Sequence, residues 1–348
     1  MIKYAILASV GHNRVYFEAS KKMSIYELKI ALKHYQIDVE TIVPEYIEDV
    51  FYITFECEKE LTEEQNQIIT KMSFISCLFQ VVEMNDEIYL KPIKLNKSYR
   101  FLESDITTIL KYSGKTNEIF TRLLINIAVN TYLKEDNEPI KLLDPIAGKG
   151  TTLFDGLTMG YEVAGVEIVE KVAHDSYLFL KKYLETKKIK HSIKFERVSG
   201  ANKSFTAKTY TFNMGKDKED VKNNSKICKI ISGNSLYSNK FFKRNYFDVI
   251  VGDLPYGVQH GNVSTSSRSN LSRNPKDFVA SAISAWEFII KRGGVLVLSW
   301  NAFVFSYDEF KEIIENNGFE VLDNEMYRNF EHKVDKSIKR DIIVAIKK

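Results

Sequence analysis

Residues 142–157 read LLDPIAGKGTTLFDGL, and this stretch decides the fold of the chain. Its first residues end an apolar strand, a turn with two glycines follows, and a helix begins near Thr151. Such glycine turns bring backbone N–H groups close to a ligand. The stretch therefore predicts a strand–turn–helix unit with a small-molecule site at its turn.

Three kinds of ligand site compete for this turn. A phosphate-binding P-loop needs glycine where Leu143 stands and serine or threonine where Gly150 stands, so that alternative fails. A dinucleotide fingerprint needs glycine where Leu153 stands, so the dinucleotide alternative is weakened. An S-adenosylmethionine site needs an acid at the strand end, then glycines that admit an uncharged ribose and a methionine tail. Asp144, Gly148 and Gly150 meet these needs.

Two later strands end in polar side chains that suit the same cofactor. GYEVAGVEI (160–168) ends at Glu167, 23 residues after Asp144, where a carboxylate can accept hydrogen bonds from both ribose hydroxyls. Taken alone, Glu167 is equally typical of a solvated strand end. KIISGNSLY (229–237) ends at Asn234, which can meet the adenine amine or serve as a plain turn residue. The predicted cofactor-binding residues are Asp144, Ala147, Gly148, Gly150, Thr151, Glu167, Ile168, Asn234, Ser235 and Asp253.

Strands and helices alternate over residues 139–348. KLLDPIAG, YEVAGVEI, KIISGN, YFDVIVGD and GGVLVLSW are apolar runs that predict an α/β fold, a parallel sheet with helices on both faces. FEVLDNEMY (319–327) and RDIIVAIKK (340–348) have no helix between them. We therefore expect seven strands, with the last antiparallel to the others. The insertion at 191–229 breaks the alternation: IKFERV and SFTAKTYTF read as an extra hairpin, and MGKDKEDVKNNSK reads as a solvated loop.

The first 138 residues predict a separate α+β unit and a connector. Residues 1–93 show the order β-α-β-β-α-β, typical of a ferredoxin-like domain, with strand-like runs at 3–9, 38–43, 49–56 and 77–84. A capping box of Ser24 with Glu27 places the first helix at 24–35, and Thr62 with Gln65 places the second at 62–72. Residues 94–138 form a linker with one amphipathic helix at 116–133.

The fourth strand of the parallel sheet ends in DLPYG (253–257), an acid and an aromatic ring at the end of a buried strand. A simple turn explains the proline and the glycine but not the acid with the ring. An exocyclic amine of a base is a poor nucleophile because its lone pair is delocalised. Asp253, with a backbone carbonyl of the Leu254–Pro255 turn, can hold the N–H groups of such an amine and orient its lone pair. Tyr256 offers a stacking face for a flipped base, worth about 1–3 kcal/mol. The predicted catalytic residues are Asp253, Leu254, Pro255 and Tyr256.

These motifs resemble those of a known family. DPIAGKGT (144–151), VEI (166–168) and DLPYG (253–257), in this order, resemble the motifs of class I S-adenosylmethionine-dependent methyltransferases that act on amino groups. More closely, DPIAGKGT resembles the Asp-Pro-x-x-Gly-x-Gly-Thr motif of RNA methylases that form N2-methylguanosine in tRNA. Those enzymes carry a ferredoxin-like region and usually a THUMP domain. The resemblance covers residues 95–348 well and the first 93 in outline. It implies a Rossmann-like fold, S-adenosyl-L-methionine as cofactor and RNA, specifically tRNA, as substrate; this chemistry requires no metal.

The sequence departs from that family in three places. Leu254 replaces the usual first proline of the motif, which leaves the backbone carbonyl available and is expected to loosen the turn. Asn234 stands where aspartate is commoner. The N-terminal block is too short for both a ferredoxin-like region and a complete THUMP domain.

Basic residues gather in several segments. KKYLETKKIKH (181–191), with Lys203, Lys208, Lys216 and Lys218 of the insertion, suits phosphate contacts or simply solvated lysines. A further cluster comprises Arg328, His332, Lys333, Lys336, Lys339 and Arg340. VQHGNVSTSSRSNLSRNP (258–275) directly follows the catalytic motif, and we expect it to close over substrate with Arg268 or Arg273 reaching phosphate.

Composition leaves few other classes of protein open. The chain has 348 residues and a net charge of +3, so any nucleic-acid contact needs clustered charge. Its three cysteines are widely spaced, which argues against disulfides and zinc, and we expect a cytoplasmic protein with no membrane association. Alternatives are a DNA amino-methyltransferase (adenine N6 or cytosine N4), which usually needs a larger sequence-reading domain, and a protein-glutamine methyltransferase, whose motif typically starts with asparagine. A catalytically inactive RNA-binding relative is the non-enzyme alternative.

Overall fold

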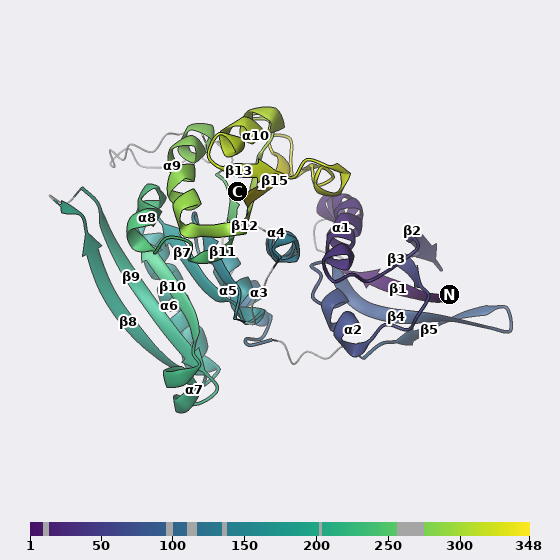
Figure 1. Cartoon of the computed structure of the whole chain (residues 1–348). Helices are drawn as coiled ribbons and strands as arrows, with labels where there is room; N and C mark the ends of the chain where they lie inside the picture. The colour runs from purple at the N-terminus through teal and green to yellow at the C-terminus, as the bar shows by residue number, and fades with distance from the viewer. Residues whose placement is uncertain (10–13, 95–99, 110–116, 134–137, 202–203, 256–274) are drawn as a thin grey trace.

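The computed structural model describes residues 1–9, 14–94, 100–109, 117–133, 138–201, 204–255 and 275–348. A five-stranded sheet lies in the N-terminal part and a ten-stranded sheet in the remainder of the described chain (Figure 1). None of the helices in these ranges combines the length and apolar character needed to cross a bilayer.

The larger sheet has the strand order β13-β15-β12-β11-β6-β7-β10-β9-β8. Its central strands, from β10 through β7, β6 and β11 to β12, pair in parallel, and β15 pairs antiparallel with β12. The predicted antiparallel last strand is therefore confirmed. The bounds are β6 Lys141–Asp144, β7 Glu162–Glu167, β10 Lys226–Ser232, β11 Phe247–Asp253, β12 Ile290–Asn301, β13 Phe319–Val321 and β15 Lys339–Lys347.

The sheet is larger than the seven strands predicted. The insertion forms β8 (Lys190–Ser199) and β9 (Thr206–Gly215), and β9 pairs antiparallel with β10, so the predicted hairpin extends the sheet at that edge. A short β14 (His332–Lys333) pairs with β15. The solvated loop predicted after the hairpin is wrong in part, because α7 (Lys218–Asn223) forms there. Asp217 caps it by accepting the N–H groups of Glu219 and Asp220.

Alternate residues of each parallel strand face opposite helical layers. Leu142 packs into a cluster with α4 (Glu118–Thr131), α5 (Thr151–Thr158) and α6 (Glu170–Thr186). Its neighbour Leu143 packs into a second cluster with α9 (Pro275–Ile289) and α10 (Tyr307–Glu315). Burial on both faces explains why these strands read as unbroken apolar runs. Two short elements complete this part, α3 (Asp105–Ile109) beside α5, and α8 (Ser238–Phe241) beside α9.

The N-terminal sheet has the strand order β2-β3-β1-β4-β5 and is antiparallel throughout. The predicted β-α-β-β-α-β element order is present, with β5 as an unpredicted addition. Both helices pack against one face of the sheet, in a single hydrophobic cluster. The bounds are β1 Ile2–Ala8, α1 Arg14–His34, β2 Ile42–Ile47, β3 Val50–Cys57, α2 Glu63–Ile69, β4 Ile75–Met84 and β5 Glu87–Pro92.

Two local predictions in this unit are corrected. Helix α1 begins well before Ser24, whose hydroxyl donates to the carbonyl of Ser20 in mid-helix instead of capping. The expected capping partner Glu27 is fully buried and accepts from the Ser73 N–H at 2.9 Å and from Asn126 at 2.7 Å. Tertiary contacts therefore override the local cap signal. Strand β2 runs through Pro44, which an edge strand tolerates. The Thr62–Gln65 capping box of α2 is confirmed.

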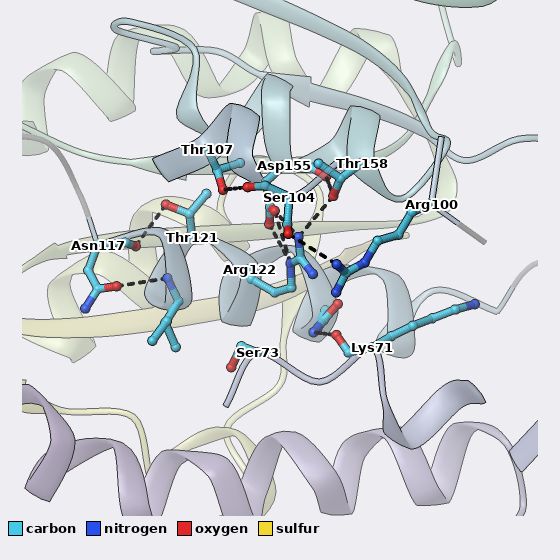
Figure 2. A network of polar contacts seen from close by, with 12 residues as sticks. Lys71, Ser73, Arg100, Ser104, Thr107, Asn117, Thr121, Arg122, Asp155 and Thr158 are labelled. Carbon is cyan, nitrogen blue, oxygen red and sulfur yellow. Dashed lines mark hydrogen bonds and ion pairs between the residues drawn. The ribbon is translucent and has the colours of Figure 1, made fainter. Parts of the chain in front are cut away.

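Helix α4 joins the N-terminal unit to the larger sheet through polar contacts on two sides (Figure 2). Asn126 donates to Glu27 and to the carbonyl of Lys71 on the N-terminal side. On the other side, the Arg122 Nε lies 3.1 and 2.9 Å from the two carboxylate oxygens of Asp155 in α5, and Nη2 donates to Thr158. Asp155 is 2% exposed, so water does little to stabilise its negative charge, and Arg122 is the cation paired with it.

Replacing Arg122 with methionine should lower the free energy of unfolding by about 3–5 kcal/mol, because it leaves the Asp155 carboxylate buried without its partner. Urea unfolding monitored by circular dichroism measures this. The double variant Arg122→Met/Asp155→Leu should recover much of the loss. Lys187→Met, which removes surface ion pairs with Glu103 and Asp105, is the control and should cost far less. Equal losses of stability in Arg122→Met and Lys187→Met would contradict this role of the buried Arg122–Asp155 ion pair.

Candidate cofactor and active site

Asp144 ends strand β6 at the carboxyl edge of the sheet and is 3% exposed. Burial raises its pKa to about 7, partly opposed by hydrogen bonds from Thr152 and from the backbone N–H of Ile146, while the nearby carboxylates of Asp253 and Glu167 raise it further. The three acids predicted from separate strand ends therefore lie close enough to influence one another. This confirms that the ends of β6, β7 and β11 meet at one edge.

The glycines after Asp144 have different roles. Gly148 has φ +50°, and a Cβ built on it would meet no heavy atom within 4 Å, so a ligand can lie directly against its backbone. Gly150 has φ +87° and sits at the N-terminus of α5, where a Cβ would lie 3.1 Å from the Phe154 ring. A third glycine, Gly165 of β7, serves packing, because a Cβ there would approach Ala147 to 2.7 Å. The turn is thus pressed against the sheet on one side and open on the other.

Glu167 ends β7 beside this turn. One carboxylate oxygen accepts the Gly148 N–H at 3.0 Å and the other accepts the Val169 N–H at 2.7 Å. Burial raises the pKa of Glu167, and these backbone donors lower it. Each oxygen has a second lone pair that can accept a ribose hydroxyl. The neighbouring Ile168 is 38% exposed and offers an apolar surface at the rim of the site.

The residues after β10 are only partly placed as predicted. The Oδ1 of Asn234 accepts the Leu236 N–H at 3.0 Å and so caps the 3-10 turn η2 (Ser235–Tyr237); its contact with adenine stays a prediction. Ser235 is buried, and its hydroxyl accepts from the Trp286 indole N–H at 3.0 Å. The Ser235 side chain therefore anchors α9, and the contact of Ser235 with the cofactor stays a prediction. Thr151 and Ala147 are also buried, at the base of the turn.

Asp253 ends β11, between β6 and β12, with its side chain 18% exposed. One carboxylate oxygen accepts from the Ser299 hydroxyl of β12, and the other lies 3.7 Å from the guanidinium of Arg340 on β15. Ser299 and Arg340 were not among the predicted site residues. They come from strands far away in the sequence, and no local motif marks them. Thr152, which donates to Asp144, was also missed, although it lies within the quoted glycine stretch.

The sequence predicted that Leu254, in place of the usual proline, would loosen the turn. This prediction is wrong. The Leu254 N–H donates to the carbonyl of Ser299 at 2.8 Å, a bond that proline cannot make, and its side chain is 1% exposed. The residue therefore extends the β11–β12 pairing by one bond and fixes the start of the turn. Pro255 follows it and is exposed. Tyr256, Arg268 and Arg273 lie outside the described residues.

The basic cluster near the last hairpin contains both buried and exposed side chains. His332 and Arg340 are 6% and 5% exposed, so neither fits the two roles open to this cluster, surface phosphate contact or a solvated side chain. The Arg340 guanidinium lies over the Phe120 ring of α4 at 4.4 Å, and burial lowers the pKa of its cross-strand neighbour His332 to about 4. Lys333 and Lys336 remain exposed. In the described ranges no group of three or more His, Cys, Asp or Glu side chains is arranged to hold a metal ion.

Comparison with known proteins finds similarity in structure alone: no family model and no curated protein matches the sequence. One similar structure is magnesium protoporphyrin IX methyltransferase (ChlM) from Synechocystis PCC 6803 with bound SAM, at 13% identity and a TM-score of 0.37, over 70% of this chain and 90% of that chain. TehB from Haemophilus influenzae is similar at 16% identity and a TM-score of 0.33, over 61% and 59%. The 16S rRNA N2 G1207 methyltransferase (RsmC) from T. thermophilus, in complex with AdoMet and guanosine, is similar at 17% identity and a TM-score of 0.34, over 88% and 58%. Similarity at this level does not assign a substrate, and function has to rest on the site itself.

The geometry of the turn fits S-adenosylmethionine. The open side of Gly148 would admit the methionine tail against the backbone, Asp144 would offer a buried acid to its amino group, and Glu167 would offer acceptors to the ribose hydroxyls. When bound, the cofactor supplies a methyl group on a positively charged sulfur.

Cofactor affinity should depend on pH through Asp144. Below its pKa of about 7 the carboxyl is protonated and cannot attract the ammonium group of the cofactor. Affinity should therefore rise with pH through about 7, by up to about tenfold per unit below the pKa, until the cofactor amine itself loses its proton near pH 8. Calorimetric titration with S-adenosylhomocysteine from pH 5.5 to 8.5 measures this. In Asp144→Asn the loss of affinity below pH 7 should disappear, whereas the exposed Asp38→Asn should retain that loss. An unchanged profile in Asp144→Asn would exclude this role.

Proposed function

We propose that this protein is an S-adenosylmethionine-dependent methyltransferase that forms N2-methylguanosine in RNA, with tRNA as the substrate. The observation that carries the proposal is the Asp253 carboxylate at the carboxyl end of β11, held by Ser299 and Arg340 at the edge that also carries Asp144 and Glu167. A cofactor site and a hydrogen-bond acceptor for an amine thus lie at one edge of one sheet.

Asp253 acts on the amine of the base. Its carboxylate accepts the N–H groups of the exocyclic nitrogen and turns the lone pair toward the methyl group. Positive charge develops on the nitrogen as it takes up the methyl group that the bound cofactor would supply, and the adjacent Asp253 carboxylate stabilises this charge. The nitrogen then passes one proton to the carboxylate, which releases it to solvent. The backbone carbonyl of Leu254 lies in the turn fixed by the Leu254 N–H bond to Ser299, where it is a second acceptor for the same amine.

Arg340 and Ser299 are positioning residues in this scheme. Each engages a different oxygen of Asp253, so the carboxylate cannot rotate without losing one contact. The stack of Arg340 on Phe120 fixes the guanidinium in turn. His332 beside it is neutral at physiological pH because burial lowers its pKa to about 4, so it adds no charge to the pair.

The N-terminal unit is assigned from its strand order and its contacts with the rest of the chain. We infer a ferredoxin-like domain at 1–93, a connector at 94–138 and a methyltransferase domain at 139–348. The strand order β2-β3-β1-β4, with both helices on one face, supports the first assignment. Helix α1 packs on α4 and reaches η3 (Glu325–Tyr327), where Tyr26 donates to Glu325 at 3.1 Å. The unit is therefore attached to the methyltransferase domain and can present RNA to it.

Replacing Asp253 with asparagine should reduce methyl transfer at least a hundredfold while cofactor affinity stays within about threefold, because the amide loses the anionic acceptor that the developing charge needs. Incubation with labelled cofactor and tRNA, ribosomal RNA, DNA or protein, followed by nucleoside identification, is the measurement. Labelled N2-methylguanosine is expected. Label confined to DNA or N6-methyladenosine would overturn the proposal, and cofactor binding without any transfer would favour the inactive alternative.

Arg340→Met should lower kcat about ten- to hundredfold with little change in cofactor affinity, and Arg340→Lys should restore part of the rate. The reason is that the Asp253 carboxylate loses its contact with the Arg340 guanidinium. Lys339→Met is the matched control, since the adjacent Lys339 pairs with Glu331 and not with Asp253. Parallel losses of kcat and of thermal stability, with no rescue by lysine, would assign Arg340 to packing alone.

A further inference from the structure

The β8–β9 hairpin reaches the same sheet edge as the predicted active site. Strand β9 runs antiparallel to β10, with Lys208 opposite Ser232, the last residue of β10. Ala207 and Thr206 therefore lie beyond the end of β10, and the hairpin projects past the carboxyl edge; Figure 1 shows it as a long ribbon at one side of the sheet. Phe205 stacks on Tyr237 at 5.2 Å, so the projecting end is anchored beside η2. Four strand spacings separate β9 from β11, or about 20 Å along the edge.

One face of this hairpin carries a row of aromatic rings. Tyr177 of α6 stacks on Tyr210 at 4.3 Å, and Tyr210 lies 5.3 Å from Phe195 of β8. The row grades from buried to exposed: Tyr210 is 9% exposed and Phe195 is 49% exposed. Tyr210 thus contacts the Phe195 ring from the inner side, and about half of Phe195 meets solvent. A ring held from behind and open in front is the arrangement on which an unpaired base stacks.

Basic side chains lie on the same face, nearer the projecting end. Arg197 is two residues beyond Phe195, on the same face of β8, with its guanidinium 5.5 Å from the Phe195 ring. Lys208 is its cross-strand partner and also pairs with Glu170. Over residues 187–216 the sequence has eight basic residues (Lys187, Lys188, Lys190, Lys194, Arg197, Lys203, Lys208 and Lys216) and one acid, Glu196. Of the strand residues in this set, Arg197 and Lys208 share the face of Phe195, whereas Lys190 and Lys194 lie on the other face of β8. The Arg197 guanidinium is therefore the charge placed to meet a phosphate beside the Phe195 ring.

We propose that this face of the β8–β9 hairpin binds the RNA substrate outside the active site, with Phe195 stacking on an unpaired base and Arg197 contacting phosphate. The proposal rests on the RNA methyltransferase function proposed above and specifies where the RNA is held. Phe195 and Arg197 lie on β8, five strand spacings or about 25 Å from β11 along the sheet, so they engage nucleotides flanking the target and leave the target base free to enter the site. Charge and a supported, exposed ring together favour RNA over a protein strand added to β8.

Phe195→Ala and Arg197→Ala test this face. Binding of labelled bulk tRNA is measured by fluorescence anisotropy between 50 and 200 mM salt. Phe195→Ala should weaken binding at least about fivefold. Arg197→Ala should reduce the slope of log affinity against log salt by about 0.7–0.9, the loss of one phosphate contact. Leu133→Ala and Arg292→Ala, exposed residues at the opposite edge of the same sheet, are the matched controls and should bind as the unaltered protein does.

The outcomes separate this proposal from the proposed function. If tRNA is methylated but the two hairpin variants bind it normally, the hairpin proposal fails and the function stands. If the variants lose tRNA binding and no RNA is methylated, the hairpin binds RNA and the enzymatic proposal fails. Absence of tRNA binding by the unaltered protein overturns the hairpin proposal. The proposal also fails if the control variants lose as much tRNA affinity as the two hairpin variants. Retained cofactor affinity and an unchanged unfolding midpoint show that the variants are folded.

Discussion

The site depends on the parallel alignment of β6, β7 and β11, which places the last residue of each strand at one edge of the sheet. Asp144, Glu167 and Asp253 are brought together by this alignment and not by their order in the chain. Burial is the main cause of the pKa of about 7 at Asp144, and the nearby carboxylates of Asp253 and Glu167 raise it further. Such a cluster of acids is unfavourable without a cationic partner. A ligand with an ammonium group and a positively charged sulfur matches that electrostatic demand.

The other half of the site depends on antiparallel closure of the sheet. Because β15 returns antiparallel beside β12, Arg340 of β15 pairs across from Asn301, the last residue of β12, near the end of β11. Its guanidinium then reaches Asp253 while resting on Phe120. Leu254 adds a backbone bond to β12 where a proline could not. The Asp253 carboxylate and the start of its turn are thus held by contacts from β12 and β15, which gives the carboxylate a defined direction.

Helix α4 couples this arrangement to the N-terminal unit. It presents Phe120 to Arg340, Arg122 to Asp155 of α5, and Asn126 to Glu27 of α1. Tyr16 of α1 lies edge-on to His332, 5.8 Å between ring centroids, and so supports the strand opposite Arg340. The two sheets therefore share a helix whose residues touch both, and the N-terminal unit contributes to the packing behind the active site as well as to any contact with RNA.

The sequence by itself determined the elements whose signal is local. Apolar runs flanked by acids and glycines identified the parallel strands, and strand polarity alone implied that Asp144, Glu167 and Asp253 would share an edge. Tertiary structure decided the rest. Ser24 and Glu27 have the spacing of a capping box. However, Glu27 is buried against Ser73 and Asn126, and both Ser24 and Glu27 lie inside α1. Ser299 and Arg340 have no motif, because their position near Asp253 follows from the pairing of β11, β12 and β15. Likewise, the periodicity of residues 190–215 predicts strands, but only their register with β10 carries Arg197 and Phe195 toward the catalytic edge. Local patterns report what each segment can form, and contacts between distant segments decide which side chains meet.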